Sequence, residues 1–196
     1  MHRIIHDRPS RIASGRGKVG SRGLERYRHF MDISAAEFRE AMGRFATGVT
    51  IVTVDLDGEV HGMTANAVAS VSLAPLLLLV CVEHSARTHA HLHAKKRFGV
   101  NILAEHQRLI SEYYAKPVYT HENAEMEAGA RFDRTAKGTP ILRGALAYLE
   151  CRLQSAQDAG DHTIFIAEVE EVVVHPGEPL LFFRGKYRKI GEEVVG

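Results

Sequence analysis

The sequence predicts a mainly β domain, either a barrel or a sandwich, with helices at its periphery. Three observations lead to this class. Short segments rich in β-branched and other apolar residues recur along the chain, turn signals separate them, and only two or three segments show helical spacing. The helices do not alternate with the strands, and neither a GxGxxG nor a Walker loop occurs, which disfavours a doubly wound nucleotide-binding fold.

Net charge divides the 196 residues into a short basic segment and a mildly acidic body. Residues 1–30 hold eight basic residues (Lys and Arg) and two acidic residues, a net charge of +6. Residues 31–196 hold 17 basic and 22 acidic residues, a net charge of −5. The first segment is rich in Arg, Gly and Ser and lacks an apolar pattern, so we expect a disordered extension. We expect residues 31–196 to form the working domain, and a variant that starts at Met31 to keep full activity. Nucleic-acid binding through the extension is an alternative that we disfavour.

The first elements of the body are expected to be a helix and a hairpin. Ser34 can cap a helix, and Glu37, three residues later, completes a capping box. The helix is expected to run to Gly48, because residues 49–54 are rich in β-branched side chains that favour a strand. Asp57-Gly58 is a typical hairpin turn, after which the chain should return in a second strand.

A polar stretch, an apolar strand and a helix follow. Residues 62–73 are small and rich in hydroxyl groups, and Pro75 separates them from the apolar run 76–82. A continuous apolar run between turn residues predicts a strand that is buried on both faces. Residues 85–96 predict a helix with a hydroxyl N-cap and with basic residues near its C-terminal end.

The second half of the body supplies the remaining strands. The expected elements, in chain order, are a strand at 98–103, a helix at 107–114, a polar connection at 116–139, and strands at 148–155, 163–175 and 180–184. Apolar and polar residues alternate along part of the strand at 163–175, which indicates that one of its faces is buried.

Composition disfavours a membrane protein and a disulfide-stabilised one. The longest apolar run, residues 76–82, is far shorter than the roughly 20 residues that a membrane helix needs. The two cysteines, Cys81 and Cys151, both lie in apolar, strand-like segments, so we expect each to be free and buried. This cysteine usage is typical of the reducing cytoplasm, where we expect the protein to act.

Residues 62–72 are a candidate binding strip beside the apolar strand. Thr64, Asn66, Ser70 and Ser72 carry hydroxyl or amide groups, and in an extended chain these even-numbered positions share one face. Alanines at the intervening positions would let a flat polar ring approach the main chain closely. The alternative is an ordinary polar edge strand.

Residues 85–88 are a candidate anion site at the start of the predicted helix. Two hydroxyls, the free N–H groups of a helix N-terminus and the charge of Arg87 would suit a phosphate. Plain helix capping is the alternative.

The Gly-Asp-His turn at residues 160–162 is a third candidate. Its glycine permits a close approach of the main chain, and His162 offers a hydrogen-bond donor or acceptor at the mouth of the sheet. The alternative is a turn whose histidine faces the solvent.

His89, His91 and His93 do not predict a metal site. Successive members of this series point about 200° apart around a helix, so the three rings cannot converge on one ion. We interpret them as solvated helix residues, and we expect no metal in the protein.

Taken together, these segments resemble the flavin reductase-like family, the short NAD(P)H:flavin reductases that serve two-component monooxygenases. The similarity spans about residues 34–190 and leaves out the basic extension. The matching segments, in chain order, are residues 45–53, 62–72, 85–88, 98–103, 160–162 and 179–187.

The resemblance implies an FMN-binding split β-barrel with Greek-key strands and peripheral helices, assembled as a homodimer. It also implies the residues that hold the cofactors. These are Thr64, Ala65, Asn66, Ser70, Val71 and Ser72 for the isoalloxazine and ribityl groups; Ser85, Arg87 and Thr88 for the phosphate; Phe98 and Asn101 from the next strand; Gly160, Asp161 and His162 near the nicotinamide; and Tyr187 to close the pocket.

The activity implied by the resemblance is hydride transfer from NADH or NADPH to FMN or FAD, which supplies reduced flavin to a partner monooxygenase. Hydride transfer depends on positioning the two rings, so amides and hydroxyls suffice, and His162 would act as an orienting hydrogen-bond donor. Two alternatives remain: a tightly bound FMN that carries electrons, and reduction of a ferric or corrinoid acceptor. The sequence leaves open the choice of flavin and the choice of nicotinamide.

Overall fold

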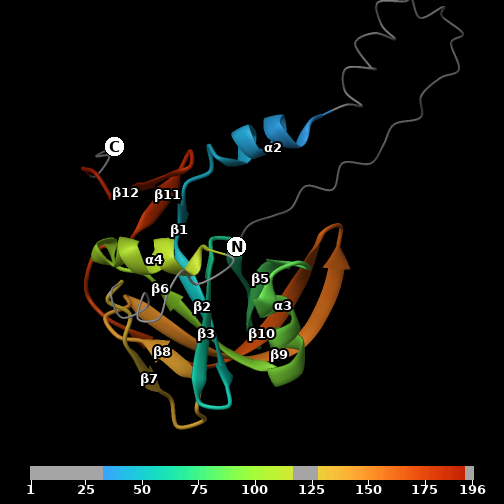
Figure 1. Cartoon of the computed structure of the whole chain (residues 1–196), viewed down its shortest axis with the longest axis vertical. Coiled ribbons are helices and arrows are strands. Elements are labelled where there is room, and N and C mark those ends of the chain that lie inside the picture. Colours follow the sequence, from blue (N-terminus) through green and yellow to red (C-terminus); the bar gives the residue numbers. More distant parts are fainter. Residues whose placement is uncertain (1–32, 117–127, 193–196) are drawn as a thin grey trace, which may run out of the picture. The chain divides into compact units, whose positions relative to one another are not determined.

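The computed structural model describes residues 33–116 and 128–192 of the chain (Figure 1). The predicted extension, residues 1–30, lies outside the described residues, as do residues 117–127 of the predicted polar connection. The chain divides near Met42 into an N-terminal unit, which contains most of the helix α2 (Ala35–Met42), and a C-terminal unit, which contains the strands. No helix in the described ranges has the length and apolarity needed to cross a membrane.

The capping box predicted for the first helix is confirmed. Ser34 Oγ and Glu37 Oε2 lie 2.7 Å apart, the Glu37 main-chain N donates to Ser34 Oγ, and the Ser34 main-chain N donates to Glu37 Oε2. The helix ends at Met42, before the predicted end at Gly48, because residues 47–48 are drawn into a strand that pairs with Leu181 and Phe182.

Twelve strands, two helices and a 3₁₀ turn follow α2 in the described residues. The strands are β1 (Thr47–Gly48), β2 (Thr50–Leu56), β3 (Glu59–Ala65), β4 (Val68–Leu73), β5 (Leu76–Glu83), β6 (Arg97–Ile102), β7 (Phe132–Arg134), β8 (Pro140–Leu142), β9 (Ala147–Ala159), β10 (His162–Val174), β11 (Leu181–Phe183) and β12 (Lys186–Arg188). The helical elements are α3 (Arg87–Lys95), η1 (Glu105–Gln107) and α4 (Arg108–Tyr114).

Seven antiparallel strands form the main sheet, in the order β3-β2-β6-β9-β10-β5-β4 (Figure 1). The neighbours β2–β6, β6–β9 and β10–β5 are distant in sequence, as Greek-key connections require. The edge strands β3 and β4 are not hydrogen-bonded to each other, so the sheet is open between these two strands. The predicted mainly β fold, a split barrel with peripheral helices, is confirmed.

β2 is buried on both faces and separates two apolar clusters. Val52 and Val54 point into one cluster together with Leu92 of α3, and Ile51 points into the other together with Ile110 of α4. The helices α3 and α4 therefore cover opposite faces of the sheet at β2 (Figure 1). The hairpin predicted at Asp57-Gly58 connects β2 to β3, with positive φ angles at both turn residues.

The apolar strand at residues 76–82, now β5, departs from the prediction of burial on both faces. Leu78, Val80 and Val82 are buried in the core, but the residues between them are only partly buried and Leu76 is 49% exposed. One face of β5 packs into the barrel, and its other face is covered by no described element. An unbroken apolar run can thus mark a strand with an uncovered outer face.

Candidate functional site

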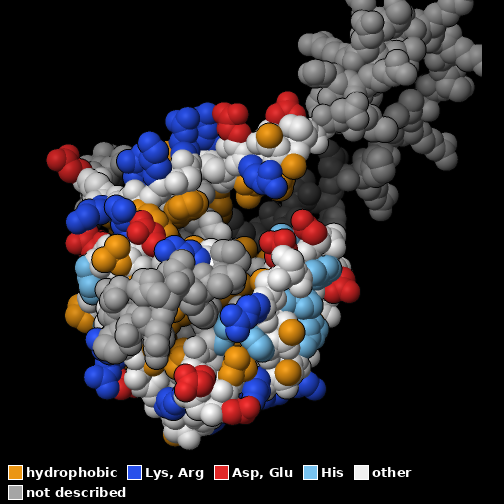
Figure 2. Space-filling model, viewed as in Figure 1, with side chains coloured by type: hydrophobic (Ala, Val, Ile, Leu, Met, Phe, Trp, Pro, Cys, Tyr) orange, Lys and Arg blue, Asp and Glu red, His pale blue; other side chains and the backbone are white. Residues whose placement is uncertain are grey.

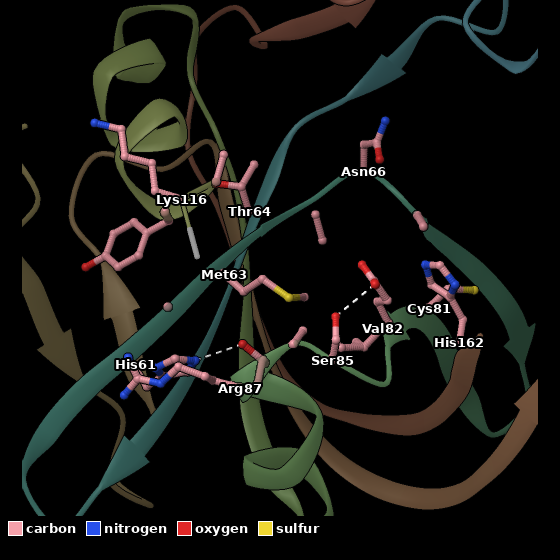
Figure 3. A pocket seen from close by; sticks show the side chains of 18 residues that line it. His61, Met63, Thr64, Asn66, Cys81, Val82, Ser85, Arg87, Lys116 and His162 are labelled. Atoms are coloured by element: carbon pink, nitrogen blue, oxygen red, sulfur yellow. Dashed lines mark hydrogen bonds between the residues drawn. The ribbon is translucent and has the colours of Figure 1, made fainter. Parts of the chain in front are cut away.

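A pocket with a volume of about 400 Å³ lies beside β3 at the edge of the main sheet (Figure 3). This volume is within the range of small-molecule sites, about 300–1,000 Å³. The lining comes from four places: residues 61–67 on and after β3, residues 81–83 and 85–88 between the end of β5 and the start of α3, residues 114–116 at the end of α4, and His162.

The two faces of β3 contact two different helices. On one face, His61 Nε2 lies 2.8 Å from Thr88 Oγ1 in α3. On the other face, Thr64 Oγ1 donates a hydrogen bond of 2.7 Å to the main-chain oxygen of Ser111 in α4. Because alternate residues of a strand point to opposite faces, the start of α3 and the end of α4 form opposite walls around this strand.

β3 offers main-chain hydrogen-bonding groups to the pocket. It pairs with β2 on one side and with no other described strand on its second side. An edge strand presents N–H and C=O groups that the sheet does not use. A flat polar ring that lies along residues 63–66 can therefore hydrogen-bond to the main chain, as the small residues of this stretch led us to expect.

The small size of Gly62 is used within the protein itself. A Cβ at this position would lie 2.5 Å from Cε1 of Tyr114, whose ring packs against the glycine. The ring of Tyr114 is 3% exposed and belongs to the apolar cluster beneath α4. Gly62 thus lets the end of α4 approach β3 and shapes one wall of the pocket.

The structure brings together part of the predicted cofactor set. The predicted residues that line the pocket are Thr64, Ala65, Asn66, Ser85, Arg87, Thr88 and His162. They come from three segments that are distant in sequence, and Figure 3 shows them around one hollow. Gly160 and Asp161, the other two residues of the predicted turn, stand next to the pocket, and Asp161 Oδ1 lies 2.7 Å from His162 Nδ1.

Two hydroxyls predicted to face a phosphate have protein partners instead. Ser85 Oγ donates to Glu83 Oε1 at 2.8 Å, and Thr88, only 1% exposed, has its hydroxyl against His61. The predicted hydroxyl N-cap of α3 is wrong, because Ala86 occupies that position and no side chain caps the helix. The first turn of α3 also offers main-chain N–H groups, and Arg87 lines the pocket beside it.

Phe98 and Asn101 lie inside the protein, away from the pocket. Phe98 is fully buried in the core. The Asn101 amide donates to Ile51 O at 3.0 Å and accepts from Leu142 N at 2.8 Å, so it ties β6 to β2 and β8. Neither side chain lines the pocket, because other residues of the fold surround both.

Ser70, Val71, Ser72 and Tyr187 also lie outside the lining. Val71 is the extra residue at a break in the β4–β5 register and is 47% exposed. Tyr187 in β12 has its hydroxyl 2.8 Å from Ser111 Oγ, so it supports α4 from outside the pocket. None of these four side chains lines the pocket, so the structure does not bring them together with the other predicted residues.

The predicted cofactor set left out eleven lining residues, among them His61, Met63, Cys81, Tyr114 and Lys116. The alternation along β3 could have found His61 and Met63, because they share a face with Ala65. Tyr114 and Lys116 enter the pocket through the packing of α4 on β3, which no local pattern reveals.

Burial makes His61 a neutral residue of the pocket. Desolvation lowers its pKa to about 4, and the nearby charges of His91 and Arg87 act in the same direction. The positive charge of the lining therefore comes from Arg87 and Lys116, and Glu83 is its acidic member.

The helix histidines form ring contacts along α3, on a face where Figure 2 shows histidine side chains gathered. His89 Nε2 lies 2.8 Å from Thr163 Oγ1, and the His91 ring contacts that of His61. Only His93 is exposed, so the interpretation of all three as solvated residues was too broad. Within residues 33–116 and 128–192, no three His, Cys, Asp or Glu side chains are arranged to hold a metal ion.

Comparison with known proteins decides the family. The model of the flavin reductase like domain matches residues 42–191. The chain belongs to the flavin reductase-like family. It is 37% identical over 168 residues to an NADH-dependent flavin reductase from Rhodococcus sp, an alignment that covers 84% of this chain and 90% of the relative. It is 39% identical over 155 residues to the reductase component of a 4-nitrophenol 4-monooxygenase/4-nitrocatechol 2-monooxygenase from Rhodococcus opacus, covering 79% and 80% of the two chains.

Solved structures of flavin reductases share the fold. The flavin reductase PheA2 in its native state matches with a TM-score of 0.75 and 39% identity, over 82% of this chain and 100% of the other. The NADH:FAD oxidoreductase SgcE6 of Streptomyces globisporus C-1027, in complex with NAD and FAD fragments, matches with a TM-score of 0.73 and 35% identity, over 82% and 94% of the chains. The fold of this flavin reductase-like chain is therefore the split barrel of these enzymes.

Proposed function

We propose that this chain is an oxidoreductase that moves a hydride from NADH or NADPH to FMN or FAD and passes the reduced flavin to a separate flavin-dependent monooxygenase. The observation that carries the proposal is the pocket around the free edge of β3, in a chain of the flavin reductase-like family. Two relatives are named as the reductase component or subunit of a monooxygenase, which supports the proposal that a monooxygenase receives the reduced flavin.

The pocket residues fit a flavin in size and chemistry. The edge of β3 near Thr64, Ala65 and Asn66 offers main-chain donors and acceptors to the polar edge of a flat ring. The first turn of α3, together with Arg87, offers positive potential to a phosphate. When bound there, flavin supplies a ring that accepts a hydride and later gives up two electrons.

His162 is the residue that we propose for orienting the nicotinamide. Its Nδ1 lies 2.7 Å from Asp161 Oδ1, a carboxylate whose pKa is lowered chiefly by this hydrogen bond. We propose that Asp161 accepts from Nδ1–H, which leaves Nε2 as an acceptor in that tautomer. An acceptor suits the NH₂ group of a carboxamide, so we propose an acceptor role for His162 in place of the donor role expected from the sequence.

Enzymatic assay tests the proposed activity. Purified full-length protein is mixed with each nicotinamide and each flavin, and the loss of nicotinamide absorbance is followed. We expect oxidation that depends on added flavin, and its absence in all four combinations would refute the activity. Gel filtration then separates the alternatives, because a reductase that supplies flavin exchanges it and an electron carrier retains it.

A homodimer is the second part of the proposal. Neighbouring strands β4, β5 and β10 carry large exposed aliphatic side chains, an unusual surface for a monomer. Its members are Val71 at 47% exposed, Leu73 at 87%, Leu76 at 49%, Val172 at 48% and Val174 at 73%. We expect a second copy to cover them, and light scattering of Leu73→Glu/Leu76→Glu should show a monomer where the wild type is a dimer. A wild type that is itself monomeric at micromolar concentration would reject this part.

A further inference from the structure

Met63 is partly buried on the face of β3 that looks toward α3, between the buried residues His61 and Ala65. Its neighbours on this face, His61 and Ala65, are only 6% and 8% exposed, whereas Met63 is partly buried and lines the pocket. Figure 3 shows its side chain reaching into the hollow between β3 and the Ser85 turn, with the sulfur near the tip. A small polar oxidant that enters the pocket therefore meets the sulfur of Met63.

Two sulfur atoms line this pocket, and their chemistry differs. Cys81 reacts with peroxides as a thiolate, and burial raises the pKa of its thiol, which keeps it protonated. A thioether needs no deprotonation before it reacts. At neutral pH the thioether of Met63 can therefore react with peroxide directly, whereas the thiol of Cys81 must first lose its proton.

We propose that Met63 is an oxidation site, at which hydrogen peroxide forms methionine sulfoxide and thereby lowers the affinity of the pocket for flavin. This inference rests on the proposed function, because the oxidant arises when reduced flavin, the product, meets dioxygen. In the step, a sulfur lone pair attacks one peroxide oxygen, the O–O bond breaks, an S–O bond forms and water leaves. The sulfur is oxidised by two electrons and the peroxide is reduced by two.

The sulfoxide alters the wall that a flavin would contact. Met63 packs against the apolar cluster that includes Val52 and Val54, which offers no hydrogen-bond donor to a sulfoxide oxygen, so the oxygen should turn toward the hollow. The side chain also becomes larger and polar. Conversely, a bound flavin covers the thioether and should protect it from peroxide.

Peptide mass mapping tests the modification without any turnover. The full chain, freed of flavin, is treated with hydrogen peroxide in the presence and absence of saturating FMN. Met42, 50% exposed and outside the pocket lining, is the internal reference. We expect FMN to slow sulfoxide formation at Met63 about tenfold and to leave Met42 unchanged. Equal protection of the two methionines, or protection of neither, would overturn the proposal.

Flavin titration of variants tests the consequence, by comparing the dissociation constant before and after peroxide within each protein. In the wild type we expect it to rise about tenfold, in Met63→Leu to stay constant, and in Cys81→Ser to rise as in the wild type. Methionine sulfoxide reductase should restore the wild-type value. A rise of the dissociation constant in Met63→Leu, or no rise in Cys81→Ser, would show that the loss of affinity does not come from Met63. If untreated protein binds no flavin at all, the proposed function fails rather than this inference.

Discussion

His61 Nε2 and Thr88 Oγ1 lie 2.8 Å apart and join the edge strand β3 to the first turn of α3. The two side chains are 6% and 1% exposed, and the hydrogen bond crosses between two walls of the flavin reductase pocket. Because the ring is neutral at physiological pH, the pair adds no charge to the site. Its effect is to hold the first turn of α3 at a fixed place beside β3.

A double-mutant cycle tests this connection. His61→Leu removes the hydrogen-bond partner of the buried Thr88 hydroxyl, and Thr88→Val removes the partner of His61 Nε2. Each substitution should therefore lower the free energy of unfolding by about 1–3 kcal/mol. The double variant should lose less than the sum, because neither polar group then remains unpaired. Urea unfolding followed by circular dichroism gives the values. Strictly additive losses would mean that the two residues do not stabilise each other.

His61 should also make stability depend on pH. Its pKa is about 4 in the folded protein against 6.5 in the unfolded chain. Between these values the unfolded chain binds the extra proton, so the free energy of unfolding falls as the pH is lowered from 6.5 to 4, by up to about 3 kcal/mol. His61→Gln removes this titration, and its stability should fall less over the same interval. Parallel curves for the two proteins in urea unfolding would contradict the assignment.

Gly62→Ala should damage both stability and the pocket. The new Cβ would lie 2.5 Å from Cε1 of the Tyr114 ring, and forcing the ring aside in a packed cluster costs about 1–3 kcal/mol. Gly48→Ala is the matched control, since a Cβ there meets nothing within 4 Å. Thermal unfolding should show a clear loss for the first variant and little change for the second. Adding Tyr114→Leu to Gly62→Ala should recover part of the loss.

The sequence predicted best those features that short-range interactions determine. The capping box of Ser34 and Glu37 and the hairpin at residues 57–58 depend on neighbouring residues alone, and both are confirmed. The pocket residues of β3 and α3 could be named because both segments match the family, although β4 and β5 lie between them in the chain. The motif does not specify the partner of each side chain, because packing decides it. The sequence therefore predicted a phosphate as the partner of the Thr88 hydroxyl, whereas in the structure this hydroxyl faces His61.

Residues whose role depends on distant partners could not be placed from the sequence. Asn101 has the polarity of a ligand-binding residue, but two other strands take up its amide, and this becomes visible only when β2, β6 and β8 are assembled. Tyr114 is the last residue of α4 and Lys116 follows it, and this helix showed no sign of function in the sequence. They line the pocket because α4 packs on β3 through Gly62.

His162→Ala should slow hydride transfer without removing the flavin. The variant loses the Nε2 acceptor that we propose for the nicotinamide, so we expect NADH oxidation about a hundredfold slower with an unchanged FMN dissociation constant. Asp161→Asn keeps the ring but removes the carboxylate that holds the hydrogen on Nδ1, and it should give an intermediate rate. Stopped-flow and equilibrium fluorescence measure the two quantities. Turnover equal to that of the wild type in His162→Ala would remove this residue from the site.

Arg87→Gln should weaken the binding of FMN and leave that of riboflavin almost unchanged. The hydroxyls of Ser85 and Thr88 have protein partners, so we propose that Arg87, which lines the pocket, and main-chain N–H groups of α3 contact the phosphate. Losing one charge-assisted contact should raise the FMN dissociation constant about tenfold or more. Lys95→Gln, at the other end of the helix and paired with Asp57, is the matched control for net charge. Riboflavin lacks the phosphate, so a similar loss of affinity for both ligands in Arg87→Gln would show that Arg87 acts on the ring portion or on the fold. An unchanged affinity for FMN would place the phosphate elsewhere.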